Sequence, residues 1–374
     1  MPALAAKALF TMPRYAPEPE YRHDDPVRSG VLMVNLGTPE APTPGALRRY
    51  LAEFLSDTRI IEAPRAVWLP VLHGIVLRTR PKRSAHAYQS VWSDRGSPLA
   101  AISADQAAAL QQALDPAGER LRVALAMRYG EPSVRAGLEA LRAAGCARVL
   151  VLPMYPQYSA TTTASVFDAV FDVFKTWRRV PELRTVANYH DDPGFIAALA
   201  GSIGEAFAAH GRPDRLLFSF HGIPRQYFDA GDPYFCHCQK TARLVAEKLG
   251  LADDFWSVSF QSRFGPKEWL KPYTDETLKG WGSSGVGSVA VVCPGFSADC
   301  LETLEEIGVE NRDYFLGAGG REFRYIPALN ARTDHIEALA ALVNRHFGGW
   351  PASGPTEDER SASAARAKAI GASR

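Results

Sequence analysis

The chain has 374 residues, of which 46% are hydrophobic and 22% charged, and its formal net charge is +1. This length suits two domains better than one, and the balanced charge excludes a general electrostatic attraction to nucleic acid as a partner. The 5 cysteines are odd in number and irregularly spaced, which argues against a secreted disulfide framework and for a reducing compartment.

The two ends of the chain are unlike its middle. Residues 1–28 contain no long apolar run and include Pro13, Pro17 and Pro19, so we predict a flexible extension and no signal peptide or membrane span. Residues 349–374 are small and polar, and we predict a disordered tail there.

Short apolar runs recur along the chain, each ending in glycine, proline or a polar residue. They lie at 31–37, 122–130, 148–156, 184–190, 216–222, 256–263, 288–296 and 323–330. Runs of this length predict strands buried on both faces. Helical patterns lie between them at 102–114, 132–145, 191–210 and 238–250. Strands that alternate with helices predict an α/β protein with parallel sheets flanked by helices.

The order of these elements predicts two similar halves, because four strands, one long helix and four more strands follow one another. We place an N-terminal domain at 29–190, a C-terminal domain at 191–332 and a last helix at 333–348 that could pack on either. Ligands of open parallel sheets bind beyond the carboxyl ends of the strands, so a cleft between the halves is expected. No strand–helix turn carries a dinucleotide or phosphate-binding glycine motif.

The run at 216–222 leads directly into His221, which is followed by Gly222 and Pro224. The imidazole should therefore lie at the carboxyl end of a strand. A histidine in that place is either a structural group that caps the next turn, or a base or metal ligand. Its position alone leaves both possibilities open.

A line of carboxylates follows the run at 288–296. Ser297 or Asp299 can cap a helix there. Spacings of 3, 4 and 4 place the acidic residues on one helical face, and they are Asp299, Glu302, Glu306 and Glu310. The stripe is either a solvated face or, together with His221, a site that holds a divalent metal or moves protons.

Three other features have weaker signals. Trp269 follows Gly265-Pro266 in a loop, so we expect an exposed side chain that contacts an apolar ligand or a membrane. The segment 66–78 is expected to be mostly a buried helix, with membrane contact as the alternative. Cys236 and Cys238 are expected to be exposed loop thiols, because Cys-x-Cys lacks the usual metal-pair spacing.

Several blocks of the sequence resemble ferrochelatase, the lyase that inserts Fe²⁺ into protoporphyrin IX in the last step of haem b biosynthesis. They include VNLGTPEAPTPGALRRYLAEFLSD, RPKRSAHAYQSVWSDRGSPL, MRYG, YPQYSATTTAS, FSFHGIPRQYFDAGDPY, FQSRFGPKEWLKPYTDETL and CPGFSADCLETLEEI. The resemblance runs from about Val31 to Phe347. It implies two Rossmann-like domains, each a four-stranded parallel sheet flanked by helices, with the porphyrin in a central cleft.

The resemblance also assigns roles to single residues. His221 matches the family's active-site histidine and Glu302 its catalytic glutamate, and both would meet the metal. Glu306 matches its acidic path for protons or metal, and Asp299 its aspartate near the cleft. The positions expected to bind the porphyrin are Arg80, Tyr88 and Ser97 at its edge, and Leu36, Arg128, Tyr129 and Trp269 in the pocket wall.

The sequence departs from the animal enzymes of this family in two places. Cys300 stands where they have a histidine, and no cysteine follows Cys300 to supply their C-terminal cluster ligands. The resemblance therefore implies no required cofactor, with Fe²⁺ as substrate and a 2Fe–2S cluster not expected. Some bacterial relatives build a cluster from internal cysteines. Cys236 and Cys238 leave that possibility open.

The expected partners are protoporphyrin IX and Fe²⁺, with no nucleic acid. Contact with the preceding pathway enzyme and peripheral contact with the inner face of the plasma membrane are options for a cytoplasmic enzyme whose substrate is poorly soluble. The alternatives to a ferrochelatase are a coproporphyrin III or cobalt chelatase, and a non-catalytic carrier of haem or metal.

Overall fold

The computed structural model describes residues 15–18, 22–351 and 354–372. Most of the segment 1–28, expected to be flexible, lies outside these residues. Its described part contacts the N-terminal half, since Ala16 pairs with Trp177 in an isolated bridge and the Arg142 guanidinium forms an ion pair with Glu18 at 3.0 Å. Strand β1 already begins at Arg28.

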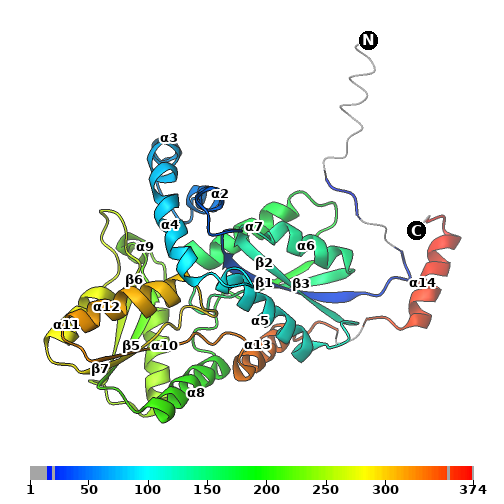
Figure 1. Ribbon diagram of the computed structural model, residues 1–374. Helices are drawn as coiled ribbons and strands as arrows, with labels where there is room; N and C mark the ends of the chain where they lie inside the picture. The colour runs from blue at the N-terminus through cyan, green and yellow to red at the C-terminus, as the bar shows by residue number, and fades with distance from the viewer. Residues whose placement is uncertain (1–14, 19–21, 352–353, 373–374) are drawn as a thin grey trace.

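The chain forms two parallel four-stranded sheets with the same strand order (Figure 1). The first sheet has the order β2-β1-β3-β4 and the second the order β6-β5-β7-β8. The strands are β1 (Arg28–Gly37), β2 (Leu121–Tyr129), β3 (Cys146–Pro153), β4 (Glu182–Thr185), β5 (Arg215–His221), β6 (Trp256–Gln261), β7 (Ser288–Val292) and β8 (Glu322–Ile326). The prediction of two four-stranded parallel sheets is confirmed.

The central strand of the first sheet shows why continuous apolar runs predict such a sheet. Val31 and Met33 are buried in one core cluster, and the alternate residues Leu32 and Val34 are buried in another. Successive side chains of a strand point to opposite faces, so a strand covered on both sides must be apolar at every position.

Several predicted strands end earlier than expected, and two of them show why. The runs at 184–190 and 323–330 leave their sheets after Thr185 and Ile326. Pro327 has no N–H to continue the ladder. Tyr189 N–H instead donates to the Pro156 carbonyl oxygen at 2.9 Å, in a loop beyond β4. Both segments therefore become loops at the carboxyl edges of the sheets.

Helices cover both faces of each sheet (Figure 1). In the N-terminal half they are α2 (Pro44–Ser56), α3 (Arg65–Val71), η1 (Leu72–Val76), α4 (Leu77–Val91), α5 (Pro98–Leu114), α6 (Val134–Ala143), η2 (Ala160–Ala164) and α7 (Ser165–Phe174). In the C-terminal half they are α8 (Pro193–His210), α9 (Arg225–Asp229), α10 (Tyr234–Leu249), α11 (Thr274–Ser283), η3 (Glu302–Asn311) and α12 (Arg312–Gly317). The η elements are π-helices.

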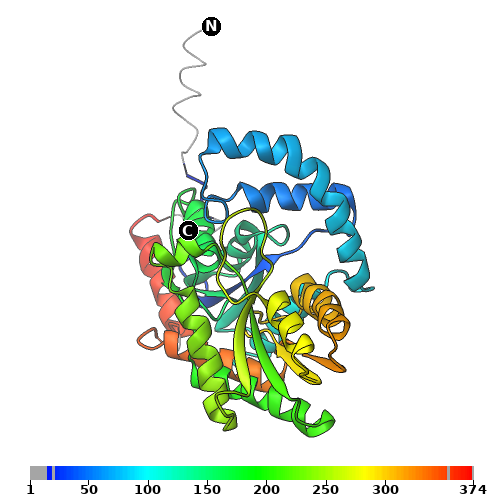
Figure 2. The same cartoon turned by 90° about the vertical axis from the view of Figure 1, so that its left-hand side faces the viewer.

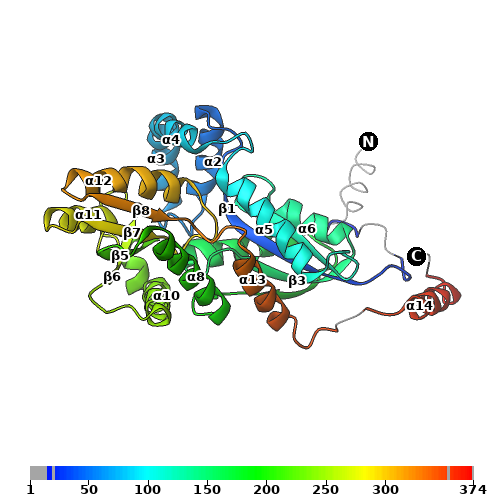
Figure 3. The same cartoon turned by 60° about the horizontal axis from the view of Figure 1, so that its bottom comes forward.

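The last predicted helix, α13 (Thr333–His346), packs on both halves. It contacts α8 of the C-terminal half and α5 of the N-terminal half (Figure 3). Side chains from all three helices and from both sheets share one core cluster. The two halves therefore form one continuous body.

The segment 66–78 was expected to be mostly buried, and this prediction is wrong for α3. This helix has no buried residue, and Val67 and Ile75 are 63% and 60% exposed. The segment belongs to a helical arm (α3, η1 and α4) that stands away from the sheets (Figures 1 and 2). Within the segment, Leu72 and Leu77 are buried in the neighbouring helix cluster.

The prediction of a disordered C-terminal tail is wrong for residues 357–369, which form α14 (Glu357–Ala369). Thr356 and Glu359 make a capping box, with each side chain accepting the other's backbone N–H. Arg360 Nε also donates to the Asp24 carbonyl oxygen at 3.0 Å. The helix lies beside the N-terminal segment, at the opposite end of the molecule from the arm (Figure 3).

Candidate active site

His221 is the last residue of β5, and its position is set by the strand register. It pairs with Gln261 at the end of β6. A Cβ at Gly222 would lie 2.9 Å from the Gln261 carbonyl oxygen and 3.1 Å from Trp269 Cε3, so only glycine lets the chain turn there. The sheet therefore presents the imidazole at its carboxyl edge, as the sequence predicted.

The tautomer of His221 follows from its hydrogen bond. His221 Nδ1 lies 2.7 Å from the Gly222 carbonyl oxygen. A carbonyl oxygen only accepts, so Nδ1 carries the proton and the lone pair of the neutral ring is on Nε2. Burial lowers the pKa of His221, and the carboxylate of Glu302 opposes this shift. The ring is thus neutral near pH 7, with one nitrogen able to accept a proton or a metal ion.

Glu302 begins the π-helix η3, where an α-helix starting near Asp299 had been expected. The backbone of η3 is held from the sheet, because Gln261 Nε2 donates to the Glu302 carbonyl oxygen at 2.9 Å. The other end of the Gln261 side chain accepts from Ser219 Oγ at 2.8 Å. Gln261 therefore fixes η3 to the strand that carries His221. The sequence placed it at a strand end but gave no sign of this contact.

Glu306 lies one turn further along η3. Its carboxylate accepts from Ser262 N at 2.7 Å, from Ser262 Oγ, and from Gln261 Nε2 at 3.3 Å. Burial nevertheless raises the pKa of Glu306 to about 7, although its bonds to Ser262 lower it. Glu310 is exposed. The carboxylates of η3 thus run from the neighbourhood of His221 to the surface, with a group in the middle that exchanges protons near neutral pH.

Asp299 is not part of η3 and has a different environment. Its Oδ1 accepts from Tyr325 OH at 2.6 Å, Thr303 Oγ1 at 3.0 Å and Ala328 N at 3.2 Å, and its Oδ2 accepts from Asn330 Nδ2 at 2.7 Å. The carboxylate is buried and fully engaged. It joins the turn before η3 to the loop after β8. Its assignment to a proton or metal path remains a prediction.

Four residues expected near the porphyrin lie where the N-terminal half meets η3. Ser97 Oγ accepts from Thr38 Oγ1 at 2.8 Å, and Tyr88 packs with Leu301 in one buried cluster. Leu36 packs with Ala298 and Cys300 in another. Arg80 on α4 is close enough for the Glu302 carboxylate to act on its pKa, which burial lowers. Residues far apart in sequence therefore converge on the start of η3.

Arg128 and Tyr129 belong to a buried polar network, and their expected place in the pocket wall stays a prediction. Arg128 Nη2 and Tyr129 OH both donate to Asp57 Oδ2, at 2.6 and 2.7 Å. Ser165 Oγ donates to the same oxygen at 2.6 Å. Tyr129 is almost completely covered. Asp57, which the sequence reasoning missed, follows α2 directly and holds the group together.

Trp269 was expected to be exposed, and this prediction is wrong because the side chain is 6% exposed. Its Nε1 donates to the Phe264 carbonyl oxygen at 3.0 Å, so the loop folds back over the ring. The ring centroid lies 6.5 Å from that of His221. Trp269 therefore walls the side of the reactive imidazole.

Cys236 and Cys238 lie in α10, which begins at Tyr234, before the helical pattern predicted from residue 238, so the expected loop is helical. Cys236 is exposed and Cys238 is buried in the core, so the two thiols face different surroundings. Across the residues that the structure describes, no group of three or more histidine, cysteine or acidic side chains is arranged to hold a metal ion. Within the same residues, no helix is both long and apolar enough to cross a bilayer.

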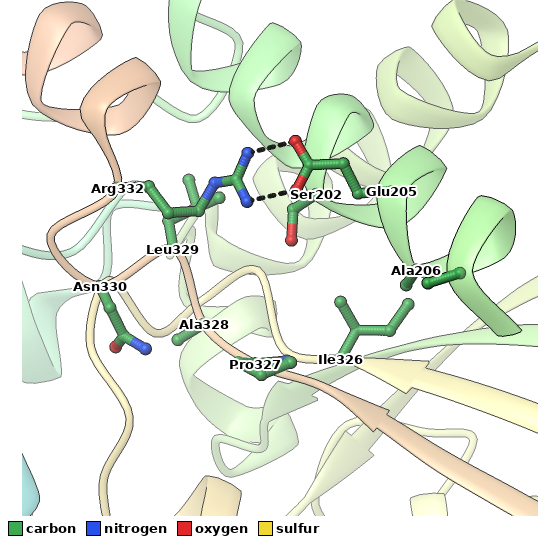
Figure 4. A pocket seen from close by; sticks show the side chains of 10 residues that line it. Ser202, Glu205, Ala206, Ile326, Pro327, Ala328, Leu329, Asn330 and Arg332 are labelled. Atoms are coloured by element: carbon green, nitrogen blue, oxygen red, sulfur yellow. Dashed lines mark hydrogen bonds and ion pairs between the residues drawn. The ribbon is translucent and has the colours of Figure 1, made fainter.

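A hollow lies between α8 and the loop after β8, and His221 is not among the residues that line it (Figure 4). Arg332 closes one side by pairing both guanidinium nitrogens with Glu205, at 2.7 and 2.8 Å. Its floor includes Asn330, whose side chain also binds Asp299. The charged groups at its rim are thus already paired.

Two parallel α/β halves with a neutral histidine and a line of carboxylates at one sheet edge define a chelatase-type protein. The family model described as Ferrochelatase matches residues 28–347. The chain therefore belongs to the ferrochelatase family.

Two relatives agree with this assignment, and a solved structure has a similar fold. The chain is 57% identical to a ferrochelatase of Azoarcus sp. (strain BH72), covering 96% of this chain and 99% of the relative. It is 55% identical to a ferrochelatase of Nitrosococcus oceani, covering 88% and 90%. The fold is similar to that of the sirohydrochlorin chelatase SirB from Bacillus subtilis subspecies spizizenii in complex with cobalt. That likeness has a TM-score of 0.50 at 11% identity, covering 88% of this chain and 99% of SirB.

Proposed function

We propose that this protein inserts Fe²⁺ into protoporphyrin IX to give protohaem, with release of both pyrrole protons. The observation that carries the proposal is the neutral imidazole of His221 beside Glu302, at the carboxyl end of β5 in a chain of the ferrochelatase family. The iron stays divalent throughout. No electron donor or acceptor is therefore required.

The proposed mechanism first needs a bent macrocycle, because a planar porphyrin hides its nitrogen lone pairs from an incoming ion. Leu36, Tyr88 and Trp269 would grip the ring, and binding energy from its periphery would offset the cost of bending. Arg80 and Ser97 would receive the carboxylates of the porphyrin. Arg80 is suited to this role because it makes no hydrogen bond or ion pair to any residue that the structure describes.

His221 Nε2 would then accept a pyrrole proton as iron enters, while Nδ1 keeps its bond to Gly222. The carboxylate of Glu302 would stabilise the imidazolium that forms. Glu306, with a pKa of about 7, would take the proton onward, and exposed Glu310 would release it to water. The proton thus passes from the buried imidazole to a carboxyl group with a raised pKa and then to the surface.

The test is an anaerobic assay of His221→Ala and Glu302→Gln with Fe²⁺ or Zn²⁺ and protoporphyrin. We expect kcat to fall by about 100-fold or more in each variant, with porphyrin binding retained. His210→Ala and Glu337→Gln, which change exposed residues on α8 and α13, are the controls and should keep the parent rate. A near-parent rate in His221→Ala would show that the imidazole is not the proton acceptor.

The same assay separates the competing functions. Parallel reactions compare coproporphyrin III with protoporphyrin as the porphyrin substrate, and Co²⁺ with Fe²⁺ as the metal. A carrier would consume free porphyrin only to the molar amount of the protein, whereas an enzyme continues past it. The proposed reaction is supported if protoporphyrin with Fe²⁺ is consumed catalytically and has the highest kcat/KM of the porphyrin and metal pairs tested. A higher kcat/KM for another porphyrin or metal would reassign the substrate.

We also propose that the tip of the arm contacts an anionic lipid surface. Val67 and Ile75 are exposed there, and Arg78, Lys82 and Arg83 on α4 are exposed nearby. Apolar side chains beside cations suit the boundary of a bilayer with anionic head groups.

The lipid proposal predicts the behaviour of a double variant. With vesicles that contain phosphatidylglycerol, V67E/I75E should lower the sedimented fraction about tenfold, because two charges enter the apolar boundary. Val180→Glu, at a residue 53% exposed in the segment before β4, is the matched control. Equal sedimentation of the double variant and the parent would contradict the contact.

A further inference from the structure

Arg80 has an unusual partner for a partly buried guanidinium. Its Cζ lies 5.3 Å from the centroid of the Phe264 ring, in the loop after β6. Within the described residues it has no hydrogen-bond acceptor and no ion-pair partner. A cation on an aromatic face is stabilised more weakly than one that donates two hydrogen bonds to a carboxylate. The N–H donors of Arg80 are therefore available to a stronger partner.

Phe264 is supported from the side of the reactive histidine. Its ring centroid lies 5.2 Å from that of Trp269, and Trp269 Nε1 donates to its carbonyl oxygen at 3.0 Å. Trp269 in turn lies beside His221. A line of rings thus runs from the imidazole to the guanidinium on α4. Phe264 is the outermost ring and is 44% exposed.

The backbone on either side of Phe264 favours a swinging movement of this ring. Ser262 is anchored, since its N–H and Oγ both donate to the Glu306 carboxylate. Gly265 has a φ of 74° and nothing within 4 Å of a Cβ built on it, so it can act as a hinge in open space. Rotation of the Phe264 side chain, which leaves its carbonyl bond to Trp269 intact, can therefore uncover Arg80 without disturbing Glu306.

We propose that Phe264 controls admission of the porphyrin, because its ring and a substrate carboxylate compete for the guanidinium of Arg80. This inference rests on the proposed function, in which Arg80 receives a carboxylate of the substrate. Association is slowed by the fraction of time that Phe264 covers Arg80. Porphyrins with a free carboxylate at that edge displace the ring, and those without one do not. Phe264 is thus a specificity residue for the acid groups of the substrate.

Stopped-flow fluorescence with protoporphyrin IX and its dimethyl ester tests the competition. Phe264→Ala should raise the association rate constant for the free acid about fivefold, the factor expected for loss of one cation–π contact. Phe264→Leu keeps an apolar side chain against Trp269 but has no aromatic face. Its association rate constant for the free acid should rise too. Neither variant should bind the ester faster. KM for zinc insertion should fall in parallel, with kcat kept within about twofold.

Phe171→Ala is the matched control, because Phe171 on α7 is 45% exposed and takes no part in the line of rings. It should bind both porphyrins at the parent rate. Unchanged association of the free acid in both Phe264 variants, or equal acceleration of acid and ester, would overturn the inference. A parent protein that binds protoporphyrin but never inserts zinc would contradict the proposed function instead.

Discussion

Glu306 and His221 have pKa values shifted in opposite directions, and burial is the largest cause of both shifts. Burial disfavours a charge, so it raises the pKa of the carboxyl group and lowers that of the imidazole. The result is a base that is neutral and a carboxyl group that is half ionised near pH 7. The lowered pKa of the imidazole and the raised pKa of the carboxyl group both favour transfer of a proton outward from His221 to Glu306.

Glu306→Gln should therefore change the pH dependence of catalysis as well as its rate. Glu306 accepts protons only when ionised, so kcat of the parent protein should rise as pH increases through about 7. In the variant, this rising limb of the pH profile of kcat should disappear, and kcat should fall by about tenfold or more. The measurement is kcat for zinc insertion between about pH 5.5 and 8.5.

Glu310→Gln is the informative comparison, because Glu310 is on the same helix but exposed. It should keep the limb near neutral pH whatever its effect on the rate. Persistence of the limb in Glu306→Gln would assign the titration to another group.

At the scale of elements, η3 shows that a local pattern of residue spacing is not sufficient to predict the type of helix. Spacings of three and four residues fit an α-helix, and the sequence predicted one. A π-helix takes more residues in each turn, and its carbonyl groups need support. Gln261 and Asn311 supply it by donating to the Glu302 and Glu306 carbonyl oxygens, at 2.9 and 2.8 Å. Gln261 is distant in sequence, so no local signal reveals its contact.

In the rest of the molecule, too, features set by local sequence were predictable and features set by contacts distant in sequence were not. Strands β1 and β5, and the place of His221 at the end of β5, follow from continuous apolar runs and were predictable. The burial of Trp269 and the network around Asp57 depend on side chains that meet only after folding. Helix α14 is an intermediate case. Its capping box, Thr356 with Glu359, is visible in the sequence, but its polar composition had indicated disorder.

The Asp299 network leads to a stability prediction for the start of η3. Asp299→Asn replaces Oδ2 with an amide that faces the Asn330 amide, so two donors would oppose each other. We expect the free energy of unfolding to fall by about 2–3 kcal/mol, as for other buried polar groups left without a partner. Urea denaturation of the variant and the parent protein measures this difference.

Asp313→Asn on α12 controls for the loss of one carboxylate, because Asp313 is exposed and its carboxylate pairs with the neighbouring Arg312. It should change stability by less than about 0.5 kcal/mol. An Asp299→Asn protein as stable as this control would show that the carboxylate does not hold the loop, and would strengthen the case for a path role.

At the scale of the whole molecule, contacts between the two halves are made by polar groups as well as by α13. Gln106 on α5 donates to the carbonyl oxygens of Ser297 and Asn330, at 2.8 and 3.0 Å. His190, in the loop beyond β4, stacks on His237 of α10 with ring centroids 3.7 Å apart. His237 Nδ1 also accepts from Tyr158 N at 3.2 Å. These contacts tie the carboxyl edges of both sheets together.

The stack of His190 on His237 should make the stability of the joint between the two halves depend on acid. Burial, and then the neighbouring His237, lower the pKa of His190 to about 4, whereas Asp191 acts in the opposite direction. The unfolded chain, with an imidazole pKa near 6.5, therefore binds more protons than the folded one. The contribution of His190 is fully present above about pH 6.5 and is lost as pH falls toward 4, by about 2 kcal/mol between pH 7 and 5.

The total stability would hide this effect, because Glu306 has a raised pKa and stabilises the fold as pH falls. The measurement is therefore the difference in free energy of unfolding between the parent protein and His190→Gln. The parent should be more stable at pH 7.5, and the gap should narrow by about 2 kcal/mol at pH 5. His210→Gln, at an exposed histidine of α8, is the matched control for the loss of an imidazole. A constant gap for His190→Gln would mean that the stacked ring does not titrate differently in the folded protein, and that acid does not act on this joint.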